Sequence, residues 1–147
     1  MNKVDFGRTA TDYSAHRAGF PSDFFARVAL HGLGIRGQRL LDLGTGTGTL
    51  ARGFALRGCC VTGLDPASSL LEKARELDHQ AGVDVNYVGG HAEKTGLPAA
   101  CFDVITAGQC WHWFDRQRAA AEIQVVARRW RGTDRTFRLA AASWVGC

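Results

Sequence analysis

A glycine-rich turn at residues 44–48 is the segment of the chain best suited to chemistry. Gly44, Gly46 and Gly48 alternate with threonine directly after a short apolar stretch, and a helical pattern begins after the turn. Glycine lets the backbone bend sharply and approach a ligand closely, because no Cβ stands in the way. The start of the following helix adds backbone N–H groups that have no intrahelical partner. We therefore expect this turn to hold a ligand.

Two carboxylates narrow the identity of that ligand. Asp65 ends the next predicted strand, where an acid can accept hydrogen bonds from both hydroxyls of a ribose. Asp42 precedes the first glycine, close to where a pyrophosphate would lie, and like charges repel. A carboxylate there suits a cationic amino group. S-adenosylmethionine has an amino group, a sulfonium and a ribose but no phosphate, so it fits better than NAD. The alternative for both acids is a local capping role.

The elements around the turn alternate between strands and helices. Short apolar or alternating runs predict strands over 39–43, 59–65, 83–88 and 102–107. Helical spacing predicts helices over 22–33, 50–57, 67–80 and 115–127, with Ser22 or Asp23 capping the first and Asp115 the last. This alternation predicts an α/β fold, a Rossmann-like and mostly parallel sheet with flanking helices. We divide the chain into an N-terminal arm (1–20), a cofactor-binding α/β domain (21–124) and an atypical basic tail (125–147).

Several motifs occur in order between residues 40 and 122. They are the glycine-rich turn at 41–48, the strand end at 63–67, a loop at 90–93 followed by 96–98, the strand start at 102–105 and its exit at 108–114. Together they resemble the class I S-adenosylmethionine-dependent methyltransferases of the broad type 11 group. The resemblance implies that the cofactor is bound by Asp42, Gly44, Thr45, Gly46, Gly48, Asp65, Pro66, Ala92, Glu93 and Gln109. Asp42 and the glycines would hold the methionine part, Asp65 the ribose, and Ala92 with Glu93 the adenine side.

Aromatic residues follow the fourth predicted strand. Trp111 and Trp113 are expected to form a wall of the substrate pocket. Aromatic faces at this position can also stabilise a sulfonium through cation–π attraction. His112 is the candidate general base for a hydroxyl or amine acceptor. The alternative is that this histidine and these rings belong to the core. The reaction implied is in-line transfer of the cofactor's methyl group to an unknown, small-molecule acceptor.

Two features depart from the family pattern. The adenine loop often has an acid before its Ala-Glu pair, and this chain has His91 there. After Ile123 the usual turn and fifth strand are not recognisable, so the chain is expected to be truncated or frame-shifted at that point, without the last strands of the fold. The fourth strand would then keep an uncovered edge, with 138–145 as the only apolar stretch left to cover it. We therefore expect low stability and weak or absent methyl transfer.

Composition limits the other classes of function. The tail 125–147 carries five arginines and one acid, whereas the rest of the chain has 13 basic and 13 acidic residues, so specific nucleic-acid binding is not expected.

No membrane segment or secretory signal is visible, and five cysteines without a C-x-x-C pair fit a reducing cytoplasm and predict no metal site. Cys59 and Cys60 are expected to be buried in a strand. An inactive cofactor-binding or interaction protein, and more weakly a nucleic-acid-associated factor or an NAD enzyme, remain as alternatives.

Overall fold

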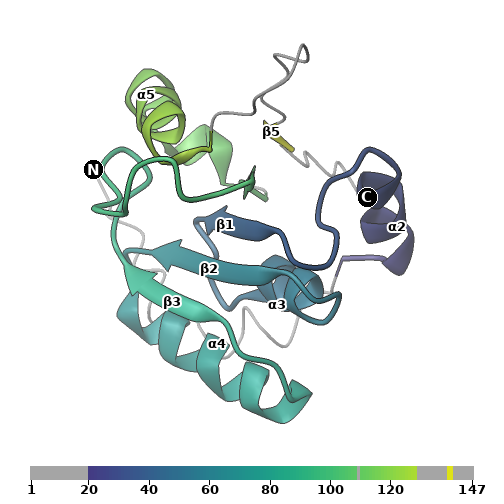
Figure 1. Ribbon diagram of the computed structural model, residues 1–147. Coiled ribbons are helices and arrows are strands. Elements are labelled where there is room, and N and C mark those ends of the chain that lie inside the picture. The colour runs from purple at the N-terminus through teal and green to yellow at the C-terminus, as the bar shows by residue number, and fades with distance from the viewer. Residues whose placement is uncertain (1–19, 109, 129–138, 141–147) are drawn as a thin grey trace.

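In the part of the chain that the structure describes, five parallel strands form a central sheet with helices on both faces. The computed structural model describes residues 20–108, 110–128 and 139–140. The strands are β1 (Arg39–Leu43), β2 (Cys60–Asp65), β3 (Asn86–Gly89), β4 (Val104–Thr106) and β5 (Leu139–Ala140). The helices are α2 (Ser22–Leu30), α3 (Thr49–Ala55), α4 (Ser68–Ala81), the short 3₁₀ helix η1 (Trp111–Trp113) and α5 (Arg116–Val126). The spatial strand order is β3-β2-β1-β4-β5, which confirms the predicted Rossmann-like α/β fold (Figure 1).

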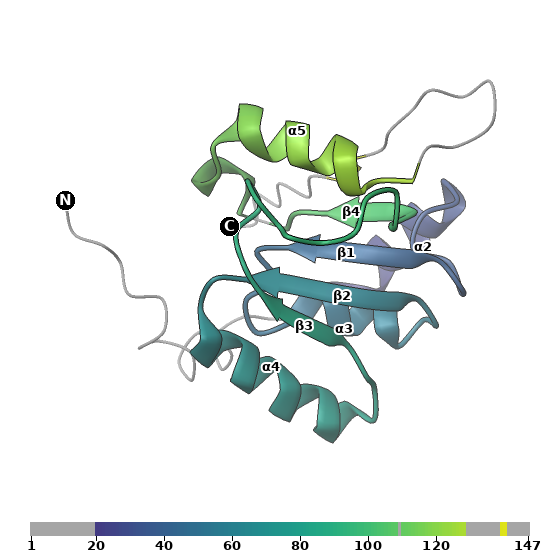
Figure 2. The same ribbon diagram turned by 60° about the vertical axis from the view of Figure 1, so that its left-hand side comes forward.

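Side chains alternate across β1 and divide the core into two layers. Leu40 is fully buried with residues of α2, α3 and α4, whereas Leu41 and Leu43 are fully buried with residues of α5. This division follows from the period of two along a strand. Figure 2 shows the same arrangement, with α5 on one face of the sheet and α3 and α4 on the other. Because both faces are covered, β1 is an apolar run rather than a simple polar–apolar alternation.

Two helix ends have the capping residues that the sequence pattern favours, and one predicted helix cap is not formed. The Asp115 side chain accepts a hydrogen bond from the Arg118 N–H and caps α5, as predicted. Gly82 ends α4 in the left-handed conformation that glycine favours. The predicted cap of α2 is wrong, because Pro21 occupies the N-cap position and no side chain caps the helix. The packing of Phe25, buried at 4% exposure, fixes α2 against the core instead.

The edge of β4 is covered by a short strand from the tail. Ile105 pairs with Leu139 and Thr106 with Ala140, both in parallel register. The expectation of an uncovered edge is therefore wrong for these residues of β4. Strand propensity is modest in this alanine-rich segment, but pairing to a sheet edge outweighs local preference. The remainder of 138–145 lies outside the described residues.

Candidate functional site

The glycine-rich turn joins the carboxyl end of β1 to the first residue of α3. Gly44, Gly46 and Gly48 have φ values of 61°, 58° and 77°, which L side chains rarely adopt. Gly44 also lies against the segment after β4, since a Cβ built on it would be 2.7 Å from the Cys110 sulfur. The predicted need for glycine thus has two physical causes at this position, backbone conformation and close packing.

Asp42 is buried at the end of β1 and is paired across the sheet. It is 2% exposed, and the Thr106 hydroxyl donates a hydrogen bond of 2.8 Å to its Oδ1. The two residues are register partners in the β1–β4 ladder. Asp42 therefore joins the ends of β1 and β4 in the structure without a ligand.

Asp65, at the end of β2, reaches the turn directly. Its Oδ2 accepts a hydrogen bond of 3.0 Å from the Gly46 N–H, and its Oδ1 accepts one of 2.9 Å from the Ala67 N–H. Asp65 is 8% exposed. A carboxylate offers about four lone-pair sites, so two remain after these contacts. Asp65 therefore holds the backbone before α4, whose N-cap Ala67 has no side-chain cap hydrogen bond, and keeps acceptor capacity for a ligand.

Thr45 places a polar atom without a partner in the same turn. Its backbone N–H donates to the Leu64 carbonyl, whereas its buried hydroxyl oxygen has no hydrogen-bond partner within the described part of the chain. Buried polar atoms are nearly always satisfied in folded proteins. A buried hydroxyl without a partner, in a turn that follows Asp42 and contacts Asp65, fits a ligand that carries both amino and hydroxyl groups, as S-adenosylmethionine does.

A pocket of about 150 Å³ opens beside the turn, at the carboxyl ends of β1, β2 and β3. It is lined by Gly44, Leu64, Pro66, Gly90, His91, Ala92, Glu93, Trp113 and Phe114. Five of the predicted site residues line it, namely Gly44, Pro66, Ala92, Glu93 and Trp113. Asp42, Thr45, Gly46, Gly48 and Asp65 form the adjoining end of the site around the turn, and Gln109 lies outside the described residues. The other four lining residues, Leu64, Gly90, His91 and Phe114, were not predicted as site residues, although all of them lie within the motifs at 63–67, 90–93 and 108–114.

Two carboxylates attach the loop at 90–97 to α5. Glu93 Oε1 accepts a hydrogen bond of 2.9 Å from the Asp115 N–H. Glu122 Oε1 accepts from both the N–H and the hydroxyl of Thr95, at 3.0 and 2.6 Å. The position of the pocket wall therefore depends on α5. Glu122 was not predicted, because nothing in its own segment distinguishes it from a solvated helical acid.

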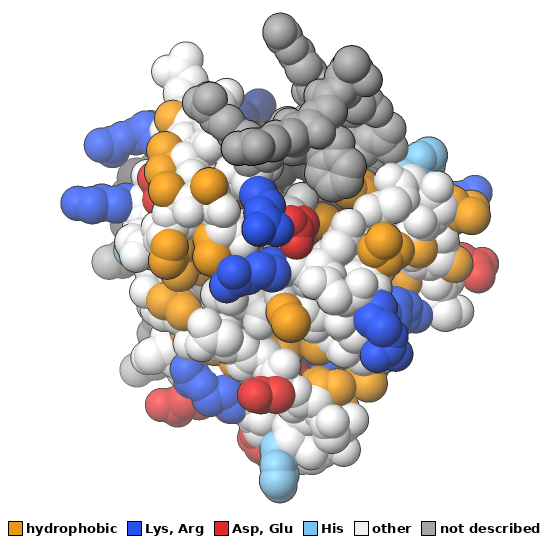
Figure 3. Space-filling view, in the orientation of Figure 1, with side chains coloured by type: hydrophobic (Ala, Val, Ile, Leu, Met, Phe, Trp, Pro, Cys, Tyr) orange, Lys and Arg blue, Asp and Glu red, His pale blue; other side chains and the backbone are white. Residues whose placement is uncertain are grey.

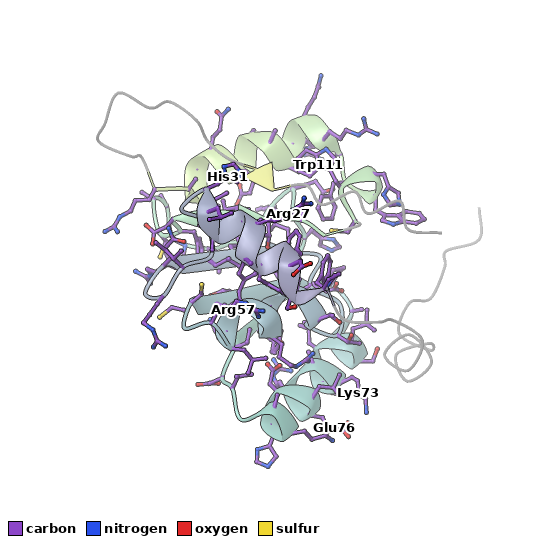
Figure 4. The ribbon with its side chains drawn as sticks, turned by 90° about the vertical axis from the view of Figure 1, so that its right-hand side faces the viewer. Arg27, His31, Arg57, Lys73, Glu76 and Trp111 are labelled. Carbon is purple, nitrogen blue, oxygen red and sulfur yellow. The ribbon has the colours of Figure 1, made fainter. Side chains whose placement is uncertain are left out.

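The aromatic residues after β4 divide into two pairs. Trp111 and Phe114 pack edge to face at 6.0 Å between centroids and adjoin the core beneath α5, and Figure 4 labels Trp111 beside that helix. His112 and Trp113 lie outward, with ring centroids 4.8 Å apart, and Trp113 is 64% exposed. Trp113 thus lines the pocket and His112 lies beside it without lining the pocket, whereas Trp111 packs partly against the core.

The described residues provide no metal centre. Within 20–108, 110–128 and 139–140, no His, Cys, Asp and Glu side chains gather in a group of three or more that could hold a metal ion. The same part of the chain has no helix that is long and apolar enough to cross a membrane.

Comparisons with known proteins agree on one family. Residues 41–129 match the family model described as "Methyltransferase domain". An uncharacterized methyltransferase of Mycobacterium tuberculosis is 30% identical over 85% of this chain and 48% of its own length. A malonyl-[acyl-carrier protein] O-methyltransferase of Serratia marcescens is 36% identical over 84% of this chain and 47% of its own length. The chain spans about half the length of these curated relatives.

Solved structures show the same fold. A SAM-dependent methyltransferase from Aquifex aeolicus superimposes with a TM-score of 0.64 over 70% of this chain and 57% of that structure, at 21% identity.

Proposed function

Since the chain belongs to the methyltransferase domain family, we propose that it binds S-adenosylmethionine beside β1 and β2 and transfers the methyl group to a small-molecule acceptor. The observation that carries this proposal is the turn at 44–48, which lies between the buried carboxylates Asp42 and Asp65. The Asp42 carboxylate would repel a pyrophosphate placed beside the first glycine, which favours this cofactor over NAD.

The residues around the turn would share the binding of the cofactor. Asp42 and Thr45 would accept hydrogen bonds from the cationic amino group, and the free lone pairs of Asp65 would accept from the ribose hydroxyls. The adenine would lie in the pocket beside Ala92, which is 2% exposed, with Glu93 and Pro66 at its borders. When bound, the cofactor supplies a methyl group made electrophilic by the sulfonium.

The acceptor would approach from the side of η1. Trp113 offers an exposed aromatic face at the pocket, and the exposed ring of His112 lies beside it, tilted by 43°. His112 would take the proton of a hydroxyl or amine acceptor, and Trp113 would exclude water from the reacting atoms. The protein's part in the reaction is otherwise alignment of the two reactants.

A small molecule suits this surface better than a nucleic acid. On the face shown in Figure 3, lysine and arginine side chains are scattered among acidic and apolar ones instead of forming one stripe. Nucleic-acid binding proteins usually gather basic residues on one face. We propose that any affinity for nucleic acid comes from the arginines of the tail, falls steeply with salt and is lost when 125–147 are deleted.

Calorimetric titration with S-adenosylhomocysteine, S-adenosylmethionine and NAD tests the proposal. We expect S-adenosylhomocysteine to bind more tightly than NAD, and the heat of binding to disappear in an Asp42→Ala/Asp65→Ala variant that still unfolds cooperatively. Tighter binding of NAD would overturn the cofactor assignment. Because the chain spans about half of its relatives, binding of S-adenosylmethionine without methyl transfer to any of a panel of hydroxyl and amine acceptors would favour a binding protein over an enzyme.

A further inference from the structure

A buried ion pair joins the glycine-rich turn to helix α4. Arg52 Nε lies 2.8 Å from Asp78 Oδ1, and the two side chains are 15% and 5% exposed. Arg52 Nη2 also donates a hydrogen bond of 2.8 Å to the carbonyl of Thr47, and a longer one of 3.4 Å to the carbonyl of Ala74. Thr47 belongs to the turn and is 2% exposed. One guanidinium therefore connects the backbone of the turn to a carboxylate on a different helix.

Tyr87 of β3 completes this cluster from the other side. Its hydroxyl occupies the space where a Cβ on Gly48 would lie, so the last glycine of the turn packs directly on it. The same hydroxyl faces Asp78, without the alignment of a full hydrogen bond. Asp78 thus lies between the two side chains, Arg52 and Tyr87, that contact the turn from behind.

A contribution to stability does not by itself account for this buried polar cluster. Arg52 Nε, both Asp78 oxygens and the Tyr87 hydroxyl are buried without an aligned hydrogen-bond partner among the described residues. Burial raises the pKa of the Asp78 carboxyl, although Tyr87 and Arg52 act to lower it and Asp84 adds to the rise. Apolar residues of similar volume often stabilise a fold as well as a buried ion pair does. A cluster this costly to desolvate needs a further role.

We propose that Arg52 and Asp78 are positioning residues, which hold the turn in the conformation that binds S-adenosylmethionine. The inference rests on the proposed function. Asp78 fixes the guanidinium, the guanidinium fixes the Thr47 carbonyl, and the adjacent Gly46 and Gly48 keep their positions relative to Asp65. A displacement of about 1 Å in such a support can reduce function by up to about 100-fold.

The test separates positioning from stability. Asp78→Asn is expected to lower both the unfolding temperature and the affinity for S-adenosylhomocysteine, the latter about tenfold or more. The double variant Arg52→Met/Asp78→Leu replaces the pair by apolar side chains and is expected to recover the unfolding temperature but not the affinity. A double variant that binds S-adenosylhomocysteine as tightly as the wild type would overturn the proposal.

A conservative variant covers the case in which the double variant does not fold. The single ammonium of Arg52→Lys can face Asp78 or the Thr47 carbonyl but not hold both. We expect a severalfold loss of affinity at a nearly unchanged unfolding temperature. The matched control is Lys73→Met/Glu76→Leu, which removes the solvent-exposed ion pair of α4 (Figure 4) and should change neither quantity.

Hydrogen exchange of the ligand-free protein distinguishes this proposal from the cofactor assignment. The Gly48 N–H donates to the Thr45 carbonyl at 2.9 Å, and the Arg52 N–H to the Gly48 carbonyl at 2.7 Å. Both amides are expected to exchange faster in the double variant than in the wild type or the Lys73/Glu76 control. Unchanged exchange refutes the positioning role, whereas faster exchange in a protein that does not bind S-adenosylhomocysteine would refute only the cofactor.

Discussion

The Gly46 N–H donates a hydrogen bond of 3.0 Å to Asp65 Oδ2, which joins the turn after β1 to the end of β2. The other oxygen of the same carboxylate accepts from Ala67 at the start of α4. Asp65 therefore contributes to the fold before any ligand is bound. A loss of ligand affinity on its substitution has to be measured beside a loss of stability.

Replacement of Asp65 tests both contributions. In Asp65→Asn one amide oxygen remains, so only one of the two backbone N–H groups keeps a full acceptor and the negative charge is lost. We expect the affinity for S-adenosylhomocysteine to fall by about 1–3 kcal/mol, and the free energy of unfolding to fall by about 1 kcal/mol. Calorimetry and urea unfolding measure the two quantities. Asp23→Asn, an exposed change on α2, is the control, and an Asp65→Asn protein with unchanged affinity would exclude a ribose contact.

The relation between Gly46 and Asp65 could be predicted from the sequence, because both lie in local patterns. A glycine after an apolar strand and an acid at the end of the next strand are brought together by any parallel sheet in which the strands are neighbours. The alternation of apolar runs and helical spacing likewise predicted the order of the elements from β1 to α5.

Contacts that depend on register could not be predicted in this way. The hydrogen bond from Thr106 to Asp42 requires β4 to lie beside β1 with these residues in register. The bonds from Thr95 to Glu122 require the loop at 90–97 to pack on α5. The β5 strand pairs because an edge is available, and its own residues have only modest strand propensity.

The contact between Glu122 and Thr95 is expected to hold the adenine side of the pocket. Glu122→Ala removes the acceptor of both the Thr95 N–H and its hydroxyl, and Thr95 is only 6% exposed. We expect a destabilisation of about 1–3 kcal/mol and a severalfold weaker binding of S-adenosylhomocysteine, because the loop carries His91, Ala92 and Glu93. Hydrogen exchange at the Thr95 amide should accelerate. Gln124→Ala, an exposed change on the same helix, should alter none of these, and a Glu122→Ala protein with wild-type affinity would show that the loop is held by other contacts.

The free energy of unfolding should depend on pH above 9 because the Cys59 thiol is buried. Of the two adjacent cysteines, Cys59 is buried and Cys60 is exposed, so the prediction that both are buried is half wrong. Burial, and then the neighbouring Cys60, raise the pKa of the Cys59 thiol from 9.0 to about 11. The folded protein therefore holds this proton more tightly than the unfolded chain between pH 9 and 11. The contribution of this thiol to the free energy of unfolding is therefore fully present below pH 9. It is lost as the pH rises through 11, and the free energy of unfolding is lower by about 2 kcal/mol at pH 11.

Cys59→Ser isolates that contribution. The Cys59 sulfur donates to the Ile35 carbonyl at 3.3 Å, and a serine hydroxyl can replace this contact without titrating in the range. We expect the free energy of unfolding of the variant to fall less between pH 9 and 11 than that of the wild type. Burial and Asp78 also raise the pKa of Tyr87, so some alkaline loss above pH 10 should remain. Cys101→Ser is the control, and equal pH dependence of Cys59→Ser and wild type would contradict the assignment.

The close approach of Gly44 to Cys110 is the most direct test of the turn's geometry. Both Gly44 and Gly32 have positive φ values, of 61° and 72°. A Cβ at Gly32 meets no atom within 4 Å, whereas one at Gly44 would lie 2.7 Å from the Cys110 sulfur and 3.0 Å from its Cβ. Alanine at Gly32 therefore measures the cost of the backbone conformation alone, about 1–2 kcal/mol. Gly44→Ala should cost about 1–3 kcal/mol more, because the packed segment after β4 has to move.

Ligand binding separates the two glycines further. Gly44 lines the pocket and Gly32 does not, so Gly44→Ala should reduce the affinity for S-adenosylhomocysteine and Gly32→Ala should leave it unchanged. Adding Cys110→Ala to Gly44→Ala removes the nearest atom, the sulfur, and is expected to recover part of the lost stability, although the Cβ of residue 110 remains close. Equal free energies of unfolding for Gly32→Ala and Gly44→Ala would show that the segment after β4 does not pack on the turn. The pocket beside Gly44 would then need another wall, since Trp113 and Phe114 belong to that same segment.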